Sequence, residues 1–361
     1  MKHKVTMQDI ADHLNISKNS VSQALTGKDG VSEATRALVK ETAELLGYVY
    51  GRSRKGQQNE APASPAPSAS GVPLAGSVLP EGGTIALIAS DYAFSRKTFF
   101  GDIYLSVDKE LKKYGCELVI QSISPEDTET LRLPAFLENR SVDGILILSH
   151  ITTPYVQAVL DTGIPTVLID HHHPSLEADS ILTNNRFSAY EGVRHLIELG
   201  HRDIGFMGDI DYSPSHYERL EGMRLAAFEA GIKLREDWLI QDAVEDSSYV
   251  HGTIAEMKER PTAWFCVNDG FGFMITSALQ HLGIKVPEEV SVVSFDNGYL
   301  SQVCTPSTTT LDVNRSLFAS YALKQLFSRL ENPQQPYTEI LLPTQLLIRE
   351  STAPPPEKPS E

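Results

Sequence analysis

Polar side chains that can read DNA bases are concentrated between residues 17 and 23. Lys18, Asn19, Ser22 and Gln23 follow one another at helical spacing. Asn and Gln can bond adenine through two hydrogen bonds in the major groove, and Lys can reach the O6 and N7 atoms of guanine. Short hydroxyl side chains suit phosphate oxygens, and the chain offers them at Thr6, Ser17, Ser20 and Ser22. These residue types predict a surface for double-stranded DNA.

Three short helices are predicted to position these groups. The first spans residues 5–14, where Thr6 and Asp9 form a start that resembles a capping box. A tight turn separates it from a second helix over 17–25, and a third helix spans 32–46. Two short helices joined by a tight turn and braced by a third form a helix-turn-helix. The alternative is an amphipathic helix with a solvated polar face, but turn, caps and donor-rich face together favour DNA binding.

Charge is unevenly distributed along the chain. The formal net charge is −16, yet residues 1–60 hold nine Lys or Arg against seven Asp or Glu. The acidic remainder repels DNA on average, so contact is expected through the basic head. Arg52, Arg54 and Lys55 could meet phosphates or an A·T-rich minor groove. Alternatively, these three residues form a solubilising linker.

Composition limits the class of protein. Hydrophobic residues make up 41% of the 361 residues, and no apolar run is long enough for a membrane helix. The first residues lack the apolar segment of a signal peptide, so we expect a cytoplasmic protein with no membrane partner. Cys116, Cys266 and Cys304 are widely spaced and are expected to be buried thiols. We expect no metal and no cofactor.

Two changes in pattern divide the chain into a head over 1–56, a linker over 57–83 and a body over 84–352. The linker is rich in Pro, Ala, Ser and Gly, which predicts a flexible to semi-rigid tether. In the body, short apolar strands alternate with amphipathic helices, a pattern typical of parallel sheets covered on both faces. The predicted strands are 84–89, 117–121, 144–148, 165–169, 203–207, 263–267 and 290–295.

The body is too long for one comfortable open sheet, so we predict an α/β fold with two doubly wound lobes. The chain is expected to cross between them at Thr183–Asn184 and near Asp312. Lobe 1 is predicted to contain about 84–183 and 311–335, and lobe 2 about 184–310 and 336–352. The Pro-rich tail 353–361 is predicted to be disordered.

Several motifs resemble the lactose-repressor (LacI/GalR) family of bacterial transcription regulators. The resemblance covers nearly the whole chain in the right order, and its motifs lie at 5–11, 16–17, 21–22, 31–36, 46–48, 199–206, 219–222, 267–269, 290–297, 308–310 and 341–352. It implies a periplasmic-binding-protein-like body with a ligand cleft between the lobes. It also implies a homodimer that binds a pseudopalindromic operator, usually as a repressor, under the control of a small molecule, commonly a sugar or sugar derivative.

The linker departs from the pattern of this family. Relatives place a short hinge helix here, with a leucine that wedges into the central minor-groove step. The matching positions hold Arg54, Gln57 and Gln58. Unstacking a base step costs free energy, and a polar Gln would not offset this cost as an inserted apolar side chain does. We therefore expect weaker DNA bending, and we expect the two heads of a dimer to search DNA with a less fixed spacing between them.

Four polar residues are candidates for the ligand cleft. Asp170, Asn268 and Asp296 directly follow apolar strands, and Arg219 opens a helix. Ligands of open α/β sheets bind at the carboxyl ends of the strands, and the resemblance implies that these four residues contact the effector. Carboxylates and amides can bond sugar hydroxyls, and Arg adds a fixed fork of donors. The alternative is helix capping, which fits Asp269 well and Asn268 in part.

Aromatic and histidine residues leave the ligand open. Many sugar-binding relatives have an aromatic residue where this chain has Ser247. Tyr249 could substitute for it, and so could Phe94, Phe99, Phe271 or Phe273, although these phenylalanines fit the core or the cleft wall better than a specific stacking platform. The run His171–His173 could reach the ligand. A metal site is the weaker alternative, because adjacent histidines point in different directions and no Cys or carboxylate cluster completes it.

Three classes of function remain. No GxSxG, P-loop, HExxH or GxGxxG motif indicates an enzyme. The chain could be a ligand-responsive repressor, a periplasmic-type solute binder or enzyme, or a DNA-binding protein without an effector. The head and the missing signal peptide argue against the second class. A ligand-induced melting shift would separate the first from the third.

Overall fold

The computed structural model describes residues 6–7, 11, 17–26, 35–36, 39, 82–91, 93 and 99–357. The chain divides into two compact units, Met1–Pro73 and Leu74–Glu361. Each unit is described by itself.

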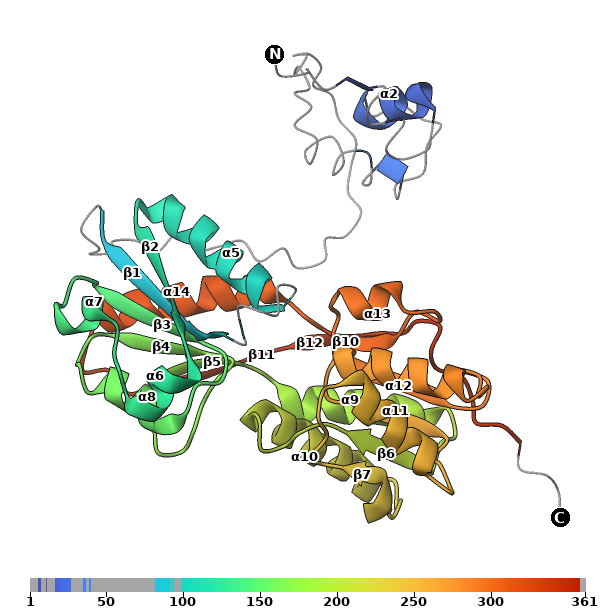
Figure 1. Cartoon of the computed structure of the whole chain (residues 1–361). Helices are drawn as coiled ribbons and strands as arrows, with labels where there is room; N and C mark the ends of the chain where they lie inside the picture. Colours follow the sequence, from blue (N-terminus) through green and yellow to red (C-terminus); the bar gives the residue numbers. More distant parts are fainter. Residues whose placement is uncertain are drawn as a thin grey trace. The chain divides into compact units, whose positions relative to one another are not determined.

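In the first unit, the second predicted helix is present as α2, Lys18–Thr26 (Figure 1). The hydroxyl of Ser17 accepts a hydrogen bond from the backbone N–H of Ser20 at 3.0 Å, so Ser17 caps the helix. Val21 and Ala24 are buried. Most of the other two predicted head helices lies outside the described residues.

The second unit contains two six-stranded sheets, each the centre of a lobe (Figure 1). The sheet of lobe 1 has the order β11-β5-β4-β3-β1-β2, and every neighbouring pair in it is parallel. Its strands are β1 Thr84–Ser90, β2 Glu117–Ile123, β3 Gly144–Leu148, β4 Thr166–Ile169, β5 Asp179–Thr183 and β11 Glu339–Leu342. Its helices are α5 Phe99–Leu111, α6 Pro125–Thr130, α7 Ala135–Glu138, α8 Thr153–Leu160 and α14 Arg315–Glu331.

The sheet of lobe 2 has the order β12-β10-β9-β8-β6-β7. It is parallel except for β12, which pairs antiparallel with β10 at the edge. Its strands are β6 Ile204–Met207, β7 Leu239–Ile240, β8 Ala263–Cys266, β9 Ser291–Asp296, β10 Thr309–Val313 and β12 Thr344–Leu347. Its helices are α9 Asn185–Glu198, α10 Pro214–Glu229, α11 Ser247–Glu256, α12 Asp269–His281 and α13 Tyr299–Val303.

Helices on both faces explain the continuous apolar strands. In β1, Ile85 and Leu87 belong to one hydrophobic core, whereas Ala86 and Ile88 belong to a second core that also contains Tyr155 of α8. Because alternate residues of a strand point to opposite faces, a strand between two helical layers must be apolar throughout. The two doubly wound lobes predicted from this pattern are present.

The chain crosses between the lobes three times. It crosses at Asn184, again at Asn314 and finally at Pro343. The predicted boundaries at 310–311 and at 335–336 are therefore wrong, because β10 belongs to the sheet of lobe 2 and β11 to the sheet of lobe 1. Two four-residue strands separated by a single proline are too short to produce a recognisable hydrophobic period.

Strand β5 is absent from the prediction because it begins with a charged residue. Asp179 is fully buried, and its carboxylate accepts hydrogen bonds from Nε of Arg329 at 2.8 Å and from Gln325 at 2.9 Å. Both partners come from α14, far along the sequence. The buried charge is thus paired by residues that a local pattern cannot reveal.

The start of the C-terminal tail is ordered, contrary to the prediction of disorder from residue 353. The carbonyl of Ala353 accepts a hydrogen bond from Nε2 of His201 at 2.9 Å, and its N–H donates to Ser291 at 3.0 Å. These contacts fix the chain against lobe 2. Among the described helices, none combines the length and apolar composition that spanning a bilayer requires.

Candidate ligand-binding site

A pocket of about 110 Å³ lies between the two lobes. This space is several times what a single water needs, so a small molecule fits. Lobe 1 contributes Phe99, Phe100, Ser149 and Asp170, and lobe 2 contributes Tyr212, Ser213, Ser215, His216, Arg219, Asn268, Asp269, Gly270, Asp296, Gly298, Tyr299 and Leu300. All four predicted ligand residues are therefore brought to one pocket by elements far apart in the sequence.

Asp170 follows β4 and is nine-tenths buried, with a left-handed backbone at φ 54°. The hydroxyl of Ser215 in α10 donates to its carboxylate at 3.4 Å. Burial raises the pKa of Asp170 to about 7, and the nearby Asp296 carboxylate adds to the effect while Arg219 opposes it. Near neutral pH this carboxyl can thus hold a proton or release it.

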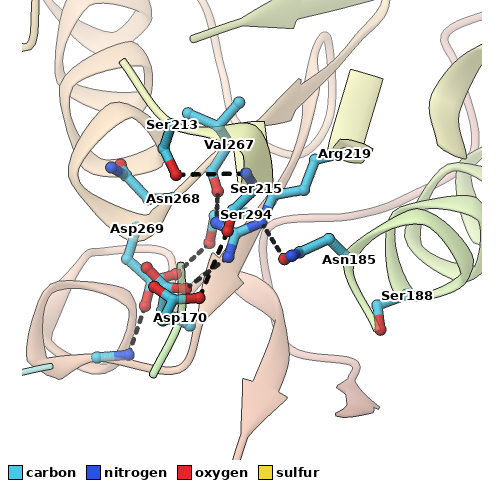
Figure 2. Close-up of polar contacts among 12 residues, drawn as sticks. Asp170, Asn185, Ser188, Ser213, Ser215, Arg219, Val267, Asn268, Asp269 and Ser294 are labelled. Atoms are coloured by element: carbon cyan, nitrogen blue, oxygen red, sulfur yellow. Dashed lines mark hydrogen bonds and ion pairs between the residues drawn. The ribbon is translucent and has the colours of Figure 1, made fainter. Parts of the chain in front are cut away.

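Arg219 is buried in the interior of α10 and held from several directions (Figure 2). Its Nε donates to Oδ1 of Asn185 at 2.9 Å, and a terminal nitrogen donates to the carbonyl of Val267 at 2.5 Å. The other terminal nitrogen lies 3.5 Å from Oδ1 of Asp296. The guanidinium also stacks 3.7 Å from the ring centre of Phe295. It is therefore a preorganised donor. It lies well inside its helix, not at the helix start that was predicted.

Asn268 caps helix α12. Its side-chain oxygen accepts from the N–H of Phe271 at 2.9 Å, and its amide donates to Glu245 at 3.3 Å. The capping alternative therefore holds for Asn268, although the residue also lines the pocket.

Asp269 also lines the pocket, although its position at the start of a helix predicts a capping residue. Its buried carboxylate accepts from Ser294 at 2.5 Å, from Thr310 at 2.8 Å and from the N–H of Gly298 at 2.5 Å. Burial, followed by the charge of Asp296, raises its pKa to about 7. The residue connects the start of α12 to β9, to the loop after β9 and to β10. Its partners are 25 to 41 positions away, so only the fold reveals this role.

Six of the residues predicted to contact DNA have described side chains, and their role stays a prediction. Thr6, Ser17 and Lys18 are exposed, and Ser20, Ser22 and Gln23 are half-buried. The hydroxyls of Ser17 and Ser20 lie 2.8 Å apart. The side chain of Asn19, together with Arg52 and Arg54, lies outside the described residues.

The sequence of the whole chain matches known regulators. Residues 6–50 match the family described as bacterial regulatory proteins, lacI family, and residues 193–352 match a periplasmic binding protein-like domain. Over 355 residues the chain is 30% identical to the NTD biosynthesis operon regulator NtdR of Bacillus subtilis (strain 168), with 96% of this chain and 99% of that protein covered. The chain belongs to the lacI family.

Other relatives agree with this assignment. The HTH-type transcriptional repressor PurR of Vibrio parahaemolyticus is 28% identical, with 95% of this chain and 97% of that protein covered. The fold matches a CelR–cellobiose complex with a TM-score of 0.67 at 24% identity, covering 96% of this chain and 99% of that one. It also matches the lac repressor dimer bound to operator, with a TM-score of 0.66 at 21% identity, covering 97% and 100%. The lacI-family chain is thus a DNA-binding transcription regulator with a helix-turn-helix head and a periplasmic-binding-protein-like body.

The apolar wall of the pocket of this lacI-family regulator comes from both lobes. Phe99 and Phe100 meet edge to face, with ring centres 5.1 Å apart. Tyr212 and Tyr299 line lobe 2. Of the predicted stacking candidates, Phe99 lines the pocket; Tyr249, Phe271 and Phe273 do not, and Phe94 lies outside the described residues.

The three histidines after Asp170 have different surroundings in this lacI-family chain. His171 is buried, which lowers its pKa to about 3. Nε2 of His172 lies 3.0 Å from Glu218 in lobe 2, and its Nδ1 lies 3.5 Å from Glu339 in lobe 1. His173 contacts Ser175. None of the three lines the pocket, and the described residues hold no metal-binding group of His, Cys, Asp or Glu.

The His172–Glu218 pair predicts a pH-dependent stability of the regulator. Its contact with Glu218 raises the pKa of His172. Burial raises the pKa of Glu218, but the contacts with His172 and Asn185, together with the charges of His172 and Arg219, lower it overall. The stabilisation from His172 is complete below its unfolded pKa and disappears as the pH rises through its folded pKa. The stabilisation from Glu218 disappears as the pH falls through its own folded pKa.

We therefore expect His172→Gln to lower the unfolding free energy by about 1 kcal/mol at pH 6 and by much less at pH 9. Thermal unfolding at both pH values measures this difference. His173→Gln, on the same loop, is the control and should show no such pH dependence. An equal loss for His172→Gln at both pH values would contradict the assigned pairing.

Proposed function

We propose that this lacI-family regulator is a dimeric repressor whose operator affinity is controlled by a small polyhydroxylated molecule, a sugar or sugar derivative, bound between its lobes. The pocket lined by both lobes carries this proposal. A ligand that contacts both lobes binds one lobe arrangement better than another, and such a difference in affinity is what shifts a conformational equilibrium.

The chemistry of the pocket supports a hydroxylated ring. Asp170 and Asp296 offer acceptors for hydroxyl groups, and Arg219 offers a fixed donor. Phe99, Phe100 and Tyr212 offer apolar surface for a ring face. Two structurally similar regulators were solved with sugars: CelR as a complex with cellobiose, and an Enterococcus faecium regulator with bound ribose.

A thermal-unfolding screen tests the effector. Full-length protein is melted with monosaccharides and disaccharides, including ribose and cellobiose, and with purine bases as a separate class of compound. A melting shift with a sugar that also changes operator binding supports the proposal. A shift with purines alone would replace the sugar with a base. No shift with any compound would favour a regulator without a small-molecule effector.

Selection of binding sites from a random duplex library at fixed salt tests the DNA side. A two-fold symmetric site supports a dimer with one half-site per head. Half-sites at variable spacing would indicate that the linker with Gln57 does not fix the heads.

Gln23 gives the sharpest test of base reading. We expect Gln23→Ala to change the preferred base at one or two positions of each half-site and to weaken binding to the selected site by about 1–3 kcal/mol. Gln157→Ala, an exposed change on α8, serves as the control. An unchanged motif for Gln23→Ala would remove Gln23 from the base contacts.

A further inference from the structure

Arg315, the first residue of α14, lies at the second chain crossing and contacts both lobes. Its Nε donates to Oδ2 of Asp102 in α5 of lobe 1 at 3.1 Å. Its terminal nitrogens donate to the carbonyls of Asp296 and Asn297 in lobe 2, at 2.9 and 3.1 Å. The guanidinium also lies 5.8 Å from the ring centre of Phe99. One side chain thus joins the first turn of α5 to the loop after β9.

The two carbonyls belong to a strained stretch of backbone. Asp296 has φ 103° and Asn297 has φ 51°, and both are non-glycine residues in the left-handed region. Such conformations cost free energy and persist only where surrounding contacts over-determine them. Arg315 provides two of these contacts, and the side chain of Asn297 is held further by Arg349 at 2.5 Å and by Asp312 at 2.8 Å.

The same two elements form opposite walls of the pocket. Asp296 lines it from lobe 2, and Phe99, three residues before Asp102, lines it from lobe 1. Arg315 itself does not line this pocket. Its planar fork satisfies three acceptors on two lobes at once, a geometry that a lysine ammonium on its flexible stem does not reproduce.

We propose that Arg315 is a positioning residue that couples the backbone of Asp296 to the start of α5, so that a movement at one wall of the pocket is felt at the other. The consequence for effector binding rests on the proposed function. The coupling itself is a property of the unliganded protein and is tested there.

Hydrogen–deuterium exchange of the unliganded full-length protein tests this coupling in two segments, 99–105 and 295–301. In Arg315→Gln we expect exchange at least tenfold faster in both. In Asp102→Asn, an exposed change in lobe 1 alone, we expect at least threefold faster exchange in 295–301 of lobe 2, because the guanidinium loses the charge of its partner in lobe 1. Asp108→Asn, on the same helix and paired with Lys112, is the matched control and should leave 295–301 unchanged.

A purely local role for Arg315 would give a different result. If Asp102→Asn leaves exchange in 295–301 within twofold of the wild type, the coupling is refuted. Should Arg315→Gln fail to fold, Arg315→Lys keeps the charge beside Asp102 and loses the fork. Faster exchange in both segments then supports the proposal, and faster exchange confined to 295–301, or protection retained in both, overturns it. No sugar enters this measurement, so its failure is distinct from a failure to find an effector.

Discussion

Replacing Arg219 with alanine is expected to abolish the effector response and to destabilise the protein together. The change removes a buried cation that pairs with Asp296 and leaves the acceptors of Asn185 and Val267 without their donor. It also empties the space above Phe295. Removal of one partner from such a buried network typically costs about 3–5 kcal/mol. We therefore expect a clearly lower melting temperature even without ligand.

Arg224→Ala is the matched control for this experiment. Arg224 lies on the same helix and is exposed, with a single contact of 3.5 Å to Gln241. Its loss should change the unfolding free energy by about 0.5 kcal/mol or less. Thermal unfolding with and without the sugar that shifts the wild type gives both readouts. A ligand-induced shift retained in Arg219→Ala would remove Arg219 from the binding residues.

Asp170→Asn is expected to act in opposite directions on stability and on binding. Because the folded pKa of Asp170 is raised to about 7, ionising this buried carboxyl destabilises the native state. The cost grows as the pH rises above the unfolded pKa and is complete above the folded pKa. Asparagine has a similar shape and carries no charge. We therefore expect the unliganded variant to be more stable than the wild type by about 1–2 kcal/mol at pH 8, and the gain to vanish towards pH 4.

The same variant should bind its effector at least tenfold more weakly, since an amide cannot offer two charged acceptors to hydroxyl groups. Melting curves at pH 5 and pH 8, with and without ligand, separate the two effects. Asp108→Asn, on α5 and paired with Lys112, should show neither. A variant that is less stable than the wild type at pH 8 would mean that Asp170 is held as a favourably paired carboxylate.

An element can be predicted from the sequence when the residues that define it are neighbours in the chain, and it is missed when its partners are far away. Strands such as β3 and β8 are uninterrupted apolar runs and were predicted from them, whereas β5 begins with a buried Asp179 whose partner Arg329 is 150 positions away. The position of Asp170 and Asp296 after apolar strands, together with the family motifs, predicts that both bind the ligand, and both line the pocket.

The role of Asp269 and the apolar wall could not be predicted in the same way. Asp269 follows a strand and begins a helix, so its local pattern is that of a cap, and its real partners lie on three other elements. Phe100 and Tyr212 are ordinary aromatic residues until two lobes fold and bring them to the same pocket. Both are consequences of tertiary packing, which a local pattern does not encode.

The three crossings between the lobes have a consequence for how the protein is made. Lobe 1 lacks α14 and β11 until the ribosome has already produced β10 of lobe 2. A nascent chain that ends before residue 315 exposes the apolar sheet face that α14 covers, including Leu146 and Val167. Neither lobe is a continuous stretch of chain, so the lobes cannot fold one after the other during synthesis. Truncated translation products are therefore expected to aggregate or be degraded. They would not persist as DNA-binding heads attached to an incomplete pair of lobes.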